Sequence, residues 1–115
     1  MYQACYDEVL EDDQAAARRV EYQALDRCVF LLGKAEKAGV QSRECVDALH
    51  WTVQLWQTFL VELADDANVL PAELRAQLIS IGIWILKQAD AIRLGRSTDF
   101  AAVSGICAIV RDGMR

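Results

Sequence analysis

Leu78-Ile79-Ser80-Ile81-Gly82-Ile83-Trp84-Ile85-Leu86 is the stretch of this 115-residue chain that decides its fold. It lies within residues 70–94, where apolar residues recur at helical spacing, so this segment is predicted to be one helix. A helix that packs on one side of a bundle needs only one apolar stripe, but this stretch is apolar almost all the way round. The helix must therefore be buried on two sides or bind something.

Two apolar faces emerge when the segment is turned by ~100° per residue. The face expected to meet the core consists of Leu74, Leu78, Ile81, Ile85, Ala89 and Ile92. The second face, nearly opposite, consists of Ile79, Ile83 and Leu86, with Arg75 and Arg93 as a charged rim. Two explanations of this second face remain open: the helix is central and touches three neighbours, or the face binds a partner.

Gly82 needs a reason of its own, because glycine costs about 1 kcal/mol relative to alanine in the interior of a helix. A neighbouring helix or a bound peptide could use the notch that it leaves. A well-packed bundle can also simply tolerate a glycine, and both explanations stay open.

Three further helices are expected around this segment. The predicted helices are residues 13–38, 43–65, 71–94 and 98–112, after an N-terminal arm at residues 1–11. Their ends are marked by Asp12 or Asp13, Gly39, Ser42, Pro71, Gly95, and Ser97 or Thr98. No segment alternates with the period of two that marks a half-buried strand, and the connections are short. We therefore expect an all-α fold, a small single-domain bundle of about four mostly antiparallel helices over residues 1–115.

Composition and charge restrict the class of function. The net charge is −5, and clustered Lys and Arg are lacking, so nucleic acid is an unlikely partner. The longest apolar run is far shorter than the ~20 residues that cross a bilayer, and the amino terminus lacks the pattern of a secretory signal. We expect a cytoplasmic protein without a membrane partner, whose four widely spaced cysteines are buried free thiols.

Catalytic motifs are missing from the sequence. His50 is the single histidine, and the spacings CxxC and HExxH, a phosphate-binding glycine loop and a nucleophile elbow do not occur. The acidic pairs lie at predicted helix ends, where capping explains them. We expect no enzyme activity, no catalytic residues, no metal and no cofactor.

Several large apolar residues lie off the predicted core stripes and form a candidate partner surface. The core stripe of the second helix is expected to be Val46, Leu49, Val53, Trp56, Leu60 and Leu63. Trp51 and Leu55 lie off this stripe and are expected to be exposed, which adds them to Ile79, Ile83 and Leu86 as partner-binding residues. Tyr2 and Tyr6 of the arm either pack on the bundle or occupy the partner groove until they are displaced.

The run Asn68-Val69-Leu70-Pro71-Ala72-Glu73-Leu74-Arg75-Ala76, with Leu78-Ile79-Ser80-Ile81-Gly82-Ile83-Trp84 and Ala91-Ile92-Arg93, resembles the FlaF family of flagellar biosynthesis proteins. The ends are similar to the family too, at Met1-Tyr2, Tyr6, Glu8-Val9 and Glu11-Asp12, and at Asp99-Phe100, Ile106 and residues 109–113. The resemblance covers nearly the whole chain. It implies a cytoplasmic regulator of flagellin production that acts with or against a factor called FlbT, and it implies direct flagellin binding in the manner of an export chaperone.

Three functions remain open. The first is an export chaperone that holds terminal helical segments of flagellin on the second and third predicted helices and regulates flagellin synthesis. The second is a post-transcriptional regulator of flagellin mRNA translation that acts through FlbT or RNA, although the negative charge disfavours direct RNA binding. The third is a self-associating structural bundle whose second apolar face is a homodimer interface.

Overall fold

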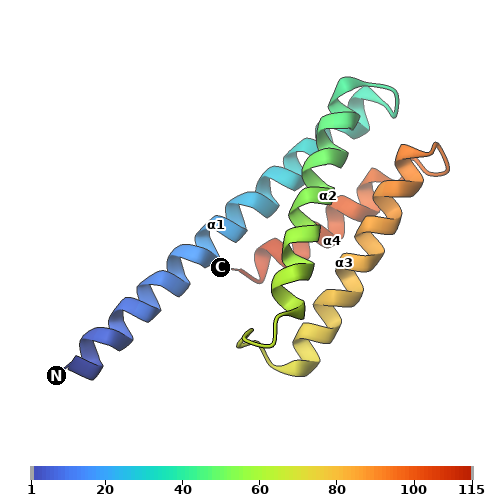
Figure 1. Cartoon of the computed structure of the whole chain (residues 1–115). Helices are drawn as coiled ribbons and strands as arrows, with labels where there is room; N and C mark the ends of the chain where they lie inside the picture. Colours follow the sequence, from blue (N-terminus) through green and yellow to red (C-terminus); the bar gives the residue numbers. More distant parts are fainter. Residues whose placement is uncertain (1, 115) are drawn as a thin grey trace.

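The computed structural model describes residues 2–114, with side chains from residue 15 onward, as four helices (Figure 1). They are α1 (Tyr2–Ala38), α2 (Arg43–Ala64), α3 (Ala72–Arg93) and α4 (Phe100–Asp112). No strand occurs between residues 2 and 114, so the predicted all-α fold is confirmed. None of the helices in this range is long and apolar enough to cross a membrane.

Glycine and serine end and begin the helices where the sequence predicts it. Gly39 and Gly95 have positive φ angles of 99° and 74°, a conformation that costs glycine little, and they follow the ends of α1 and α3. Ser42 precedes α2, and its side-chain oxygen accepts a hydrogen bond of 3.1 Å from the backbone N–H of Cys45. These local devices fix the turns between successive helices.

Two predicted helix starts are wrong. The backbone is already helical from Tyr2, so residues 2–11 are not an extended arm, and Asp12 and Asp13 lie inside α1 instead of capping it. The segment contains neither glycine nor proline and is rich in good helix formers, so nothing in it stops the helix. Before α4, the capping residue is Asp99, which accepts a 3.0 Å hydrogen bond from the backbone N–H of Ala102.

Ser97, which was expected to cap α4 directly, has a different part in the same turn. Its hydroxyl oxygen accepts a 3.1 Å hydrogen bond from the backbone N–H of Asp99. The pair forms two successive side-chain-to-backbone turns, and the helix begins one or two residues later than predicted.

The four helices do not contribute equally to the packing. Within the described residues, α1 packs against both α2 and α4, whereas α3 packs against α2, touches α4 only slightly and does not pack on α1. Figure 1 shows α2 and α3 side by side in front of α4, with α1 behind α2. The helix with the most evenly distributed apolar residues is thus peripheral.

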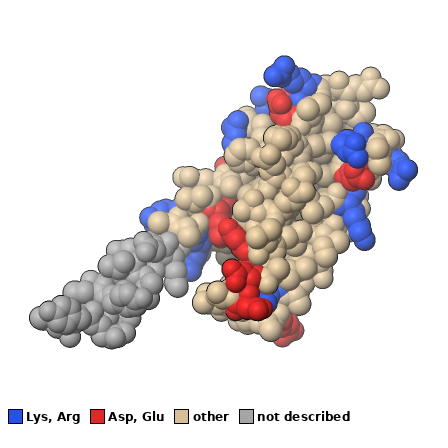
Figure 2. Space-filling model, viewed as in Figure 1, with Lys and Arg blue, Asp and Glu red and all other residues tan. Residues whose placement is uncertain are grey.

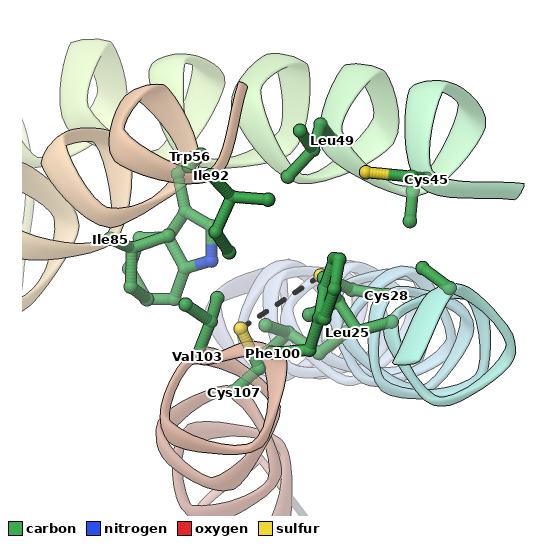
Figure 3. Packing of buried hydrophobic residues seen from close by; sticks show 14 of the residues in the cluster. Leu25, Cys28, Cys45, Leu49, Trp56, Ile85, Ile92, Phe100, Val103 and Cys107 are labelled. Carbon is green, nitrogen blue, oxygen red and sulfur yellow. Dashed lines mark hydrogen bonds between the residues drawn. The ribbon is translucent and has the colours of Figure 1, made fainter. Parts of the chain in front are cut away.

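The core is built by α1, α2 and α4 and is closed by one side of α3 (Figure 3). Its largest fully buried side chains include Trp56, Leu25, Leu32 and Ile85. Of the expected α3 core face, Ile85, Ala89 and Ile92 are buried. Leu74 of the same predicted face is 40% exposed, because it lies near the start of α3, beyond the core cluster.

Three of the four cysteines are buried free thiols, as predicted, and Cys5 lies outside the described side chains. The sulfur atoms of Cys28 and Cys107 are 3.8 Å apart and join α1 to α4 (Figure 3). The Cys28 sulfur also lies 3.1 Å from the Thr52 hydroxyl. The hydrogen bond with Cys28, together with burial, raises the pKa of the Cys107 thiol, which therefore stays neutral at physiological pH.

Candidate functional site

A groove of about 570 Å³ lies between the first half of α2 and the second half of α3. Val46 and Val53 line it from α2, Leu86 and Ala89 line it from α3, and His50 lies at its edge. Val46 is 65% exposed at the mouth of the groove. The groove is therefore an open apolar channel between two antiparallel helices, a shape that suits a third helix.

Gly82 explains how α2 and α3 approach each other below this groove. A Cβ atom at this position would lie 2.9 Å from Cδ2 of Leu60 and 3.2 Å from Cε3 of Trp56. Both contacts are closer than side chains ordinarily allow, so the glycine lets two α2 side chains rest against the α3 backbone. Of the two explanations offered by the sequence, the structure supports the first: the notch left by Gly82 is filled by side chains of the neighbouring helix α2.

The second apolar face of α3 is only partly covered inside the bundle, where Leu86 packs against the core. Ile83 is 45% exposed, while Ile79 and Leu86 are half-buried. Because α3 has one main neighbour, the alternative in which three neighbours cover this face does not hold. We call Ile79, Ile83 and Leu86 the α3 strip; Leu86 belongs to both the strip and the groove.

Trp51 and Leu55 lie on the side of α2 that faces α1. They were predicted to be exposed, and this prediction is wrong. The indole N–H of Trp51 donates a 3.0 Å hydrogen bond to the carbonyl oxygen of Ala24 on α1, and the Arg27 guanidinium lies 5.7 Å from the centre of the ring system. Leu55 is half-buried and packs against the core. The long helix α1 covers this side of α2, so the structure does not bring the two residues together with the α3 strip.

The remaining predicted residues divide into two groups. Tyr2 and Tyr6 are on α1, and their side chains lie outside the part of the chain whose side chains are described. Arg75 and Arg93, the expected charged rim, lie at the two ends of the α3 strip. The Arg93 guanidinium forms an ion pair with Asp90 at 2.6 Å, and Nε of Arg75 is buried without a hydrogen-bond partner among the described residues.

Sequence reasoning missed the α2 side of the groove. Val46 and Val53 were assigned to the core stripe of α2, but that stripe is wider than the surface that α3 covers. An apolar stripe on a helical wheel does not reveal which of its edges is left open. One signal in the sequence indicated the open edge: Val46 lies beside the polar His50, four residues later, where the apolar stripe of α2 ends.

The surface around the groove carries little charge. Figure 2 shows the face formed by α2 and α3 as a largely uncharged area, with basic side chains gathered near the carboxy-terminal end of α3. Among the described residues, no group of three His, Cys, Asp or Glu side chains is placed to hold a metal ion. The arrangement is that of an apolar binding surface with a few charged groups at its edges.

Comparison with known protein families decides what kind of protein carries this surface. The family model described as flagellar protein FlaF matches residues 2–114. The chain belongs to the FlaF family. Membership gives it a role in flagellar biogenesis or its regulation. Comparisons of this FlaF-family chain with curated proteins and with solved structures found no match.

Proposed function

We propose that this FlaF-family protein is a flagellin-binding export chaperone of the cytoplasm that also regulates flagellin synthesis. The observation that carries the proposal is the apolar groove between α2 and α3, which continues into the α3 strip. Family membership supplies the flagellar setting, and the groove supplies a surface that an amphipathic helix can cover.

The groove has the right chemistry for the terminal segments of flagellin. These segments are implied by the family resemblance to be amphipathic helices that remain unfolded before assembly. Covering exposed apolar side chains such as Val46 and Ile83 is worth roughly 1.5–3 kcal/mol each, before the cost of ordering the bound segment is subtracted. A few such contacts support binding that can still be reversed at the export apparatus.

Charge supports a role in protein binding over one in nucleic-acid recognition. The net charge of −5 keeps a complex with an aggregation-prone segment soluble and repels phosphate backbones. The groove is lined mainly by valine, leucine and alanine, with Cys45, His50 and Asp90 among its other residues. We propose a non-enzymatic protein that uses no cofactor, and we propose that it influences flagellin synthesis by sequestering flagellin or through FlbT.

The first test is to mix the full-length protein with purified monomeric flagellin, either intact or lacking its carboxy-terminal helical segment. Size-exclusion chromatography with light scattering then measures the mass of any complex. A complex formed only with intact flagellin is the expected result. Absence of a complex with either form contradicts the proposal and favours the route through FlbT or RNA.

A pair of variants places the binding site. Ile83→Asp puts a charge on the exposed centre of the α3 strip and should weaken the complex. Gln77→Asp puts the same charge on an exposed position about 120° away around the same helix and should not. Equal affinities for both variants, with unchanged circular dichroism, would remove the α3 strip from the site. Sedimentation at several concentrations without flagellin tests self-association, and a stable homodimer buried at this face would contradict flagellin binding there.

A further inference from the structure

Two arginines mark the ends of the α3 strip on one side of the helix. Arg75 and Arg93 are 18 residues apart, which at 3.6 residues per turn is a whole number of turns. Both therefore lie on the same side of α3 as Ile79 and Leu86. At a rise of 1.5 Å per residue the two positions are about 27 Å apart along the helix.

Arg75 has a donor that the chain itself does not satisfy. Its side chain is half-buried, and Nε is buried without a hydrogen-bond partner among the described residues. A buried donor without an acceptor lowers stability, and guanidinium groups pair best with carboxylates, which can accept two hydrogen bonds at once. Arg75 also forms no ion pair with the described residues, so its guanidinium is free to pair with a carboxylate from outside the chain.

Arg93 is at the other end, beside the groove, and its present ion pair is weak. It contacts Asp90 on the same helix at 2.6 Å, and both side chains are more than half exposed. An exposed pair of this kind contributes little, because water and salt screen it. Arg93 can therefore leave Asp90 for an incoming carboxylate, or pair with both carboxylates, at a small cost in free energy.

We propose that the α3 strip selects a partner helix with two carboxylates on one face, about 18 residues apart, which pair with Arg75 and Arg93. Between them, apolar residues of the partner cover Ile79, Ile83 and Leu86. This inference rests on the proposed function: the partner is a terminal segment of flagellin, and the spacing of its acidic residues determines which segment is taken. Apolar contact supplies affinity, and the two ion pairs fix register and direction.

The test measures the affinity of purified monomeric flagellin for the full-length protein by isothermal titration calorimetry. Arg75→Glu should weaken binding about tenfold or more, since a half-buried donor is replaced by a repelling charge, and Arg93→Glu should weaken it about threefold. Lys34→Glu is the matched control, because Lys34 is exposed on α1, which does not pack on α3 among the described residues. Arg75→Lys keeps the charge but loses the fork of donors, so it should weaken binding less than Arg75→Glu.

Charge exchange identifies the acidic partner. The terminal segments of flagellin are searched for pairs of acidic residues about 18 positions apart, and each residue of such a pair is changed to lysine singly. One such change should restore binding to Arg75→Glu and should weaken binding to Lys34→Glu, which still carries Arg75. If wild-type protein binds flagellin but Arg75→Glu and Arg93→Glu bind as well as Lys34→Glu, the charge rule is overturned and the proposed function stands. If the wild-type protein does not bind flagellin, the proposed function itself fails.

Discussion

Gly82→Ala tests whether the contact between α2 and α3 is as close as the structure has it. Alanine is favoured over glycine in a helix by about 1 kcal/mol, so a neutral environment would make this substitution stabilising. Here the new methyl group would lie 2.9 Å from Cδ2 of Leu60, 3.1 Å from its Cγ and 3.2 Å from Cε3 of Trp56. The leucine can move, because it is half-buried, but the ring of Trp56 is almost completely buried and cannot.

The two effects differ in size, and this fixes the expected sign. Overpacking a core contact costs typically about 1–3 kcal/mol, against a gain in helix propensity of about 1 kcal/mol. We expect Gly82→Ala to lower the free energy of unfolding by about 1 kcal/mol, equivalent to a fall in Tm of about 4 °C or more. A Leu60→Ala background removes the two contacts with Leu60 and leaves the 3.2 Å contact with Trp56, so the same substitution should cost less there than in the wild type.

Urea unfolding followed by circular dichroism gives the four free energies of this double-mutant cycle. Gly105→Ala is the control, because a Cβ at this helical position on α4 meets no atom within 4 Å and should stabilise the protein by about 0.5–1 kcal/mol. A stabilising Gly82→Ala in the wild-type background, or a coupling energy of zero with Leu60→Ala, would refute the close packing of α2 on α3.

Three further predictions concern the rest of the fold. Burial, and to a smaller extent the neighbouring carboxylate of Glu62, raises the pKa of Glu21. The native state therefore disfavours the charged form, and the stability that this group contributes when protonated is lost as pH rises through the raised pKa. Glu21→Gln should therefore be more stable than wild type at neutral pH, by less than about 1 kcal/mol because the group is partly exposed, and the difference should vanish below the ordinary glutamate pKa in urea titrations. Asp99→Ala should cost about 1 kcal/mol by removing the α4 cap, and Thr98→Ala, which tests the rejected capping residue, should cost much less in the same assay. Trp51→Phe should cost about 0.5–1.5 kcal/mol through loss of the hydrogen bond to the α1 carbonyl, and a fully exposed Trp51 would show no such loss in thermal unfolding.

The helical fold was predictable because its signals are local. Gly39, Ser42 and Gly95 act through their own backbone conformation or a hydrogen bond three residues away, and the structure has each of them in its expected place. The start of α1 was missed because Asp12 and Asp13 are good capping residues that also occur inside helices. A cap is decided by the residues before it, and nothing in residues 2–11 interrupts a helix.

The candidate site was only partly predictable because it depends on which helices become neighbours. The sequence showed that Ile79, Ile83 and Leu86 form a second apolar face, but only the packing shows that α2 is the one main neighbour of α3 among the described residues and that Ile83 stays exposed. The same uncertainty misplaced Trp51, whose side of α2 is covered by α1. Helical periodicity gives the faces of each helix, and the pairing of those faces comes from tertiary structure.

Photo-cross-linking from the groove tests most directly whether flagellin binds between α2 and α3. A photoreactive phenylalanine analogue is placed at Val46, 65% exposed at the mouth of the groove, or at Ile109, 69% exposed on α4. The two positions are similarly exposed, and none of the described residues that line the groove belongs to α4. With full-length flagellin, the account predicts a strong cross-link from position 46 and little from position 109. Equal cross-linking from both positions, or cross-linking from position 109 alone, would contradict it.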